Sequence, residues 1–180
     1  MSKKAFDEFI NKQVREKYDS KPVDWNARRD EWLDDLAKFY QKVEGFLAEY
    51  VKEKKLAINY TEETIFEEYI GSYSARTLNI ELGHHKLRLE PVGTIIIGAR
   101  GRVDLIGANG TVKFVLVNKQ SSGPKIKVDV WIEGEEPPEK SDGSEVIEWE
   151  WKIATPPPNI KYINLEQDTF LEALMEVIGG

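Results

Sequence analysis

The feature of this sequence that most constrains its fold is a change in the spacing of its apolar residues along the chain. Between about residues 25 and 54 they recur every three or four positions, as on one face of an α-helix. From residue 76 to 154 they mostly alternate with polar residues, as in strands with one buried face. Residues 165–178 return to helical spacing. The order predicts an α+β fold, in which an antiparallel β meander of about six to seven strands packs against a long N-terminal helix and a C-terminal helix.

The chain has 180 residues, with no internal repeat and no sign of a second domain. Asp24 is placed to cap the long helix, and Gly45 is a candidate break within it. We therefore predict one domain over residues 1–180, made of a helical part over 1–55, the meander over 76–154 and the C-terminal helix over 165–178.

A short segment between the long helix and the meander also has helical spacing. Thr61 or Thr64 is predicted to begin this helix, and Gly71 to end it. Glu67 follows Thr64 at the spacing of a capping box. The apolar residues on its common face are Ile65, Phe66, Tyr69 and Ile70.

Two hairpins are predicted in the second half of the meander. The first joins a strand over 100–106 to a strand over 112–117 through Asn109-Gly110, a strong hairpin signal. The second of these strands is apolar at nearly every position, so we expect a central strand that is covered on both faces. The other hairpin pairs residues 125–133 with residues 146–154, with Trp149 and Trp151 on its apolar face and therefore in the core.

Charge is concentrated in one part of the chain. Residues 133–150, the acidic stretch, hold eight acids and one base and so carry the whole formal net charge of −7. Binding to nucleic acid needs a basic surface, so we predict none. The absence of cysteine excludes disulfides, thiol catalysis and cysteine-based zinc sites. No other spacing specifies a metal site, and no motif implies a cofactor.

The chain also lacks the sequence marks of a membrane or secreted protein. Its N-terminal residues become charged again where a signal peptide would need an apolar stretch. No segment approaches the roughly 20 consecutive apolar residues of a membrane helix. We therefore predict a cytoplasmic protein that does not insert into a membrane.

Residues 101–106, followed by a glycine turn and an apolar strand, place Asp104 late in one strand and before a buried one. This arrangement resembles part of the core of the PD-(D/E)xK nucleases. In that family carboxylates hold a divalent metal ion that activates water. The resemblance implies that Asp104 is the family's aspartate and that Glu67 or Glu68 is the acid contributed by an upstream helix.

The sequence departs from that family on the next strand. The family's Glu-x-Lys falls on residues 116–118, which are Leu, Val and Asn, and Lys119 would face the other side of the sheet. The structural interpretation of Asp104 is an ion pair with Arg102, opposite Val115 if Asn109-Gly110 forms a two-residue turn.

The remaining candidate is a binding surface on the second hairpin. Trp131 lies on the polar face of that hairpin, where it can anchor an interface, and the acids of the connecting loop can attract a basic protein. The first hypothesis for function is therefore a non-enzymatic protein-binding role, as an acidic inhibitor or immunity-type partner. A nuclease-like domain is the second hypothesis, and a small-ligand binding domain is the third. The candidate binding residues are Trp131, Glu135, Glu136 and Glu139.

Overall fold

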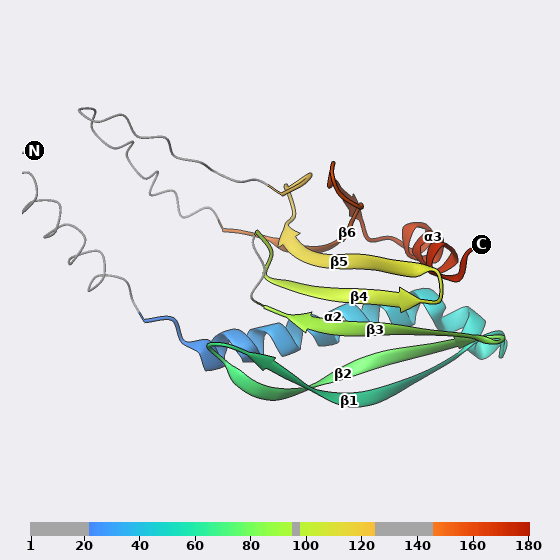
Figure 1. Ribbon diagram of the computed structural model, residues 1–180, viewed down its shortest axis with the longest axis horizontal. Coiled ribbons are helices and arrows are strands. Elements are labelled where there is room, and N and C mark those ends of the chain that lie inside the picture. Colours follow the sequence, from blue (N-terminus) through green and yellow to red (C-terminus); the bar gives the residue numbers. More distant parts are fainter. Residues whose placement is uncertain (1–21, 95–97, 125–145) are drawn as a thin grey trace, which may run out of the picture.

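The computed structural model describes residues 22–94, 98–124 and 146–180. Within them, two helices flank seven strands, each hydrogen-bonded to the next in chain order. All of these pairings are antiparallel, which confirms the predicted α+β fold with a β meander (Figure 1). The elements are α2 (Trp25–Lys52), β1 (Ala57–Glu67), β2 (Gly71–Leu82), β3 (His85–Gly93), β4 (Gly101–Gly107), β5 (Gly110–Asn118), β6 (Trp149–Ala154), β7 (Tyr162–Asn164) and α3 (Gln167–Ile178).

Helix α2 begins where the sequence predicted. The carboxylate of Asp24 accepts a hydrogen bond from the backbone N–H of Ala27 at 3.0 Å and so caps the first turn. The helix continues without a break through Gly45. Its buried stripe packs on the sheet and consists of Trp32, Leu36, Phe39, Tyr40, Val43 and Leu47.

Helix α3 covers the same face of the sheet as α2. Phe170 and Val177 are fully buried in a core that also contains Phe39 of α2 and Phe114 of β5. Gly179 ends the helix in the left-handed conformation, with a φ of 88°, which glycine adopts at little cost. The central strand β5 is buried on both faces from Phe114 to Val117.

The predicted short helix near Thr64 is wrong, because these residues form strand β1 and its turn into β2. The pair of strands, here called the ribbon, changes the side that it buries halfway along. In β1 the half-buried residues Tyr60 and Glu63 are separated by two exposed residues instead of one. In β2 the consecutive residues Thr77 and Leu78 are both fully buried. Two-stranded ribbons twist strongly, and Figure 1 shows this twist. The change of side breaks the two-residue period and produced a helix-like spacing.

The hairpin between β4 and β5 turns one residue earlier than predicted. Gly107 pairs with Gly110, so Ala108 and Asn109 form the turn, and Asp104 lies opposite Lys113 rather than Val115. The end of α3 explains the difference. The Asn109 backbone N–H donates to the carbonyl of Val177 at 3.0 Å, and its side-chain amide donates to the carbonyl of Ile178.

Strand β6 agrees with the sequence only in part. Trp151 and Ile153 are buried as predicted. The predicted core position of Trp149 is wrong, because this side chain is 40% exposed. Trp151 is covered by the Trp32 ring of α2, 6.1 Å away, whereas Trp149 lies beyond this cover beside Arg100. The predicted partner of this strand, residues 125–133, lies outside the described residues. Over residues 152–154 the two edges of β6 pair with β5 and β7.

Candidate functional site

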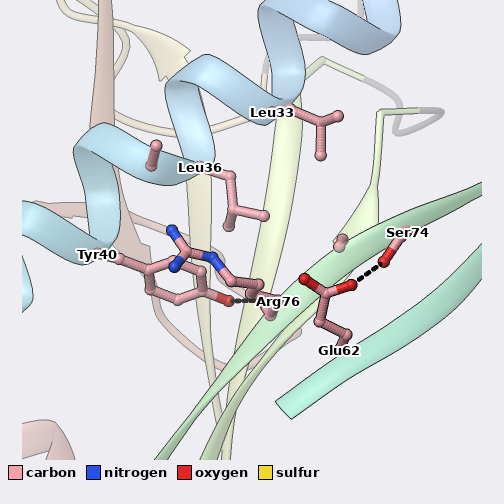
Figure 2. A pocket seen from close by; sticks show the side chains of 8 residues that line it. Leu33, Leu36, Tyr40, Glu62, Ser74 and Arg76 are labelled. Atoms are coloured by element: carbon pink, nitrogen blue, oxygen red, sulfur yellow. Dashed lines mark hydrogen bonds between the residues drawn. The ribbon is translucent and has the colours of Figure 1, made fainter. Parts of the chain in front are cut away.

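A cleft of about 260 Å³ lies between α2 and the ribbon, and it is the first candidate site (Figure 2). It exists because β2 pairs with β3 only from Leu78 to Leu82 and then diverges from the strands β3–β6, here called the sheet body. Helix α2 lines one wall with side chains that are three or four residues apart. The lining residues are Leu33, Leu36, Ala37 and Tyr40 from the helix, with Glu62, Ser74, Ala75 and Arg76 from the ribbon.

Tyr40 occupies the point where the ribbon leaves the sheet body. Its hydroxyl lies 2.5 Å from the carbonyl oxygen of Arg76 on β2 and 3.2 Å from that of Leu89 on β3, and it is the donor to both. These carbonyls lie where the β2–β3 pairing stops, so the phenol links the two strands at the point where they separate. Burial raises the pKa of Tyr40 well above its usual value, which keeps this donor protonated.

Two opposite charges stand at the cleft without pairing with each other. Glu62 and Arg76 are directly opposite in the β1–β2 register, a position that favours a cross-strand ion pair. Instead, the Glu62 carboxylate accepts from the Ser74 hydroxyl at 2.8 Å, and the Arg76 guanidinium lies 4.6 Å from the centre of the Tyr60 ring. Figure 2 shows the Arg76 side chain extending toward Tyr40 and away from Glu62, whose carboxylate is bonded to Ser74. No carboxylate of the described residues forms an ion pair with Arg76.

Asp104 forms the ion pair that the sequence predicted. Arg102 donates to its two carboxylate oxygens at 2.7 and 2.6 Å, in the bidentate geometry typical of arginine and carboxylate. This hydrogen bonding raises the pKa of Arg102. The neighbours Val103 and Leu105 are fully buried under the helices, so Asp104 lies on the opposite face of the sheet.

Glu67 lies apart from Asp104, on the helix side of the sheet. Its carboxylate accepts from the Tyr73 hydroxyl at 2.6 Å, and from the backbone N–H and the hydroxyl of Thr94 at 3.0 and 2.9 Å. A Cβ at Gly93 would lie 2.8 Å from the carboxylate carbon, so a glycine there lets the backbone approach the acid. Glu68 lies in the turn after β1.

The structure therefore does not bring together the acids that the nuclease resemblance implies. Asp104 and Glu67 lie on opposite faces of the sheet, and neither Glu67 nor Glu68 is on a helix. Within residues 22–94, 98–124 and 146–180, no group of three or more His, Asp or Glu side chains is placed to hold a metal ion.

The second candidate site is an apolar surface at the end of the molecule where α2 begins. Phe66 is 73% exposed and Tyr69 is 58% exposed, and the Tyr69 ring stacks on Trp25 at 5.0 Å. A further cavity of about 370 Å³ connects Val23 with Trp149. Six of the nine large hydrophobic side chains that are exposed in the described part of the chain lie here. This exposed apolar end consists of Val23, Trp25, Phe66, Tyr69, Val146, Ile147 and Trp149.

The candidate binding residues of the second hairpin, Trp131, Glu135, Glu136 and Glu139, lie outside the described residues. The described chain resumes at Val146, directly after this part of the acidic stretch, and runs into the exposed apolar end. Sequence reasoning missed the cleft residues Arg76 and Glu62. That they are neighbours could be found only by recognising β1 as a strand, because the β1–β2 register then places them opposite each other.

Comparison of the chain with known protein families, with curated proteins and with solved structures finds no match. Neither helix in the described part of the chain has the length and apolar character needed to cross a membrane.

Proposed function

We propose that this protein binds a basic protein partner through its exposed apolar end. The observation that carries the proposal is the gathering of exposed aromatic and aliphatic side chains at one end of the molecule. Scattered exposed hydrophobic residues are normal on a protein surface, whereas many of them at one end of the molecule point to an interaction site. Tryptophan and tyrosine are also the side chains that most often dominate the binding energy of protein interfaces.

The acidic stretch supplies the argument for a basic partner. It carries the chain's whole net charge of −7 and contains Ile147 and Trp149 of the exposed apolar end. Charge of one sign beside an apolar contact raises the rate of encounter with a partner of the other sign, while the apolar contact slows dissociation. In this proposal Trp131 adds a further anchor, and the acids Glu135, Glu136 and Glu139 attract the partner.

The test compares variants of the full chain in pull-downs from the source cell. We expect the same basic protein to be retained by wild type and lost with Phe66→Ser and with Trp149→Ala. Met175→Ser is the matched control, because Met175 is 54% exposed but lies on α3, away from the exposed apolar end. All three substitutions change exposed side chains, so each variant should keep the thermal unfolding midpoint of wild type within a few degrees.

The purified partner then separates the roles of charge and apolar contact. Changing Glu135, Glu136 and Glu139 together to Gln should slow association most at low salt, where screening is weak. Phe66→Ser should weaken the complex at every salt concentration. Retention of identical partners by Phe66→Ser, Trp149→Ala and Met175→Ser would contradict the proposal, as would a retained partner that is acidic.

A further inference from the structure

We propose that the cleft between α2 and the ribbon binds a free α-amino acid with a small aliphatic side chain. The proposal is independent of protein binding at the exposed apolar end. It depends on three features that lie together in the cleft (Figure 2). These are a guanidinium that has no ion-pair partner among the described residues, a carboxylate with one oxygen that accepts no hydrogen bond from them, and an aliphatic wall formed mainly by the helix.

The cationic side of the cleft is Arg76. Its guanidinium is held over the Tyr60 ring, whose own hydroxyl donates to Glu44 at 2.5 Å. Among the described residues, this interaction leaves the guanidinium N–H donors of Arg76 without a carboxylate acceptor. A planar guanidinium matches a carboxylate through two parallel hydrogen bonds. The ligand's carboxylate group therefore belongs beside Arg76.

The anionic side of the cleft is Glu62. One of its carboxylate oxygens accepts from Ser74, and the other has no hydrogen-bond donor among the described residues. An ammonium group offers three donors and suits this open oxygen. Glu44 accepts from the Tyr60 hydroxyl and is not among the residues that line the cleft, so it does not take the place of Glu62.

The rest of the cleft sets the size and the character of the ligand. Leu33, Leu36 and Ala37 present an aliphatic wall from α2, and Ala75 continues it on β2. At about 260 Å³ the cleft is slightly smaller than the roughly 300–1,000 Å³ of sites for drug-sized molecules. A zwitterion with a short aliphatic side chain combines the two charges, the apolar part and the small volume.

The test uses three related probes and the ¹⁵N-labelled full chain in NMR titrations. L-Leucine is the zwitterion, 4-methylpentanoate lacks its ammonium group, and 3-methylbutylamine lacks its carboxylate. We expect leucine at millimolar concentration to shift the amide signals of Ser74, Ala75 and Arg76. Each single-charge probe should bind at least about tenfold more weakly, because each leaves one charged partner without its hydrogen bond.

Two variants and one control assign the charges. Glu62→Gln should weaken leucine at least about tenfold and leave 4-methylpentanoate unchanged, and Arg76→Gln should weaken leucine equally and leave 3-methylbutylamine unchanged. Arg88→Gln is the control, because Arg88 lies on β3 beside Glu90 rather than in the cleft. Absence of leucine-induced shifts at the cleft would overturn the proposal. Equal binding of all three probes, or an equal loss with Arg88→Gln, would overturn it as well.

Discussion

Two pairs of an acidic and a basic residue on this sheet carry the same charged groups, but only one of them forms an ion pair. In the sheet body, Arg102 and Asp104 are two residues apart on β4, and Arg102 donates two hydrogen bonds to Asp104. In the ribbon, Glu62 and Arg76 are directly opposite on adjacent strands and do not pair. Position in the register alone therefore does not decide whether two opposite charges form an ion pair.

The difference follows from the surroundings of each pair. Asp104 has a side chain that is only 13% exposed, so an unpaired charge there would be costly, and Arg102 is its nearest cation. The ribbon diverges from the sheet body, and each of its charges finds another neighbour, a hydroxyl for Glu62 and an aromatic ring for Arg76. The first pair is therefore part of the architecture, whereas the second is open to a ligand.

The largest effect should come from the contact of the sheet body with α2. A Cβ at Gly101 would overlap the ring of Trp32, so Gly101→Ala should lower the free energy of unfolding by about 3 kcal/mol. Ala37 also faces the sheet from α2, but it lines the open cleft. Ala37→Leu should change the unfolding free energy by less than about 1 kcal/mol. Denaturant unfolding of both variants checks this, and a similar loss for both would show that the ribbon packs as tightly as the sheet body.

The next effect sharpens the contrast between the pairs themselves. Asp104→Ala should lower the unfolding free energy by roughly 1–3 kcal/mol, because it leaves the Arg102 guanidinium partly buried and without its acceptor. Glu62→Ala should leave the denaturation midpoint nearly unchanged, because its only described partner is an exposed hydroxyl. An unchanged midpoint for Asp104→Ala would remove the structural role of this residue.

Several of these features could be predicted from the sequence because local physics fixes them. Asp24 starts α2, Gly179 stops α3, and the ion pair of Asp104 follows from the spacing of two residues along one strand. The position of the β4–β5 turn could not be predicted, because α3 holds Asn109 from a distant part of the chain.

For a related reason, the sequence does not reveal the unpaired charges of Glu62 and Arg76. It depends on β1, whose alternation breaks where the ribbon twists, and on Tyr40, which holds the carbonyls at the divergence. The face that Trp149 shares with Trp151 predicts a core position for it, but the Trp32 ring of α2 that covers Trp151 does not cover Trp149. Burial depends on which element covers a strand, and the alternation of apolar residues within the strand does not show where that cover ends.

A smaller effect tests how the ribbon is attached to the sheet body. Tyr40→Phe removes the donor shared by the carbonyls of Arg76 and Leu89, and it should lower the unfolding free energy by about 1 kcal/mol. Amide exchange should increase in β1 and β2 more than in β4 and β5. Tyr60→Phe is the control, because the Tyr60 hydroxyl bonds a side chain of α2 and no strand carbonyl. Equal exchange throughout the sheet would contradict the role assigned to Tyr40.

The smallest effect concerns pH and the contact between the sheet body and α2. Burial raises the pKa of Asp35 above its usual 3.8, although Arg100 lies 3.1 Å away and opposes the shift. The native state therefore binds the proton more readily than the unfolded state, so Asp35 costs stability at neutral pH, and this cost shrinks as pH falls and disappears below 3.8. The unfolding free energy of Asp35→Asn relative to wild type should fall between pH 7 and pH 4, by less than about 1 kcal/mol. A relative stability that rises over this range would contradict the assignment.

Double-mutant cycles on the two acid–base pairs test most directly the claim that one pair is closed and the other open. Each cycle compares the unfolding free energies of wild type, the two single alanine variants and the double variant. We predict a coupling of about 1 kcal/mol between Arg102 and Asp104, and a coupling indistinguishable from zero between Arg76 and Glu62. A coupling between Arg76 and Glu62 as large as that between Arg102 and Asp104 would show that the ribbon pair closes in solution, and would contradict the account.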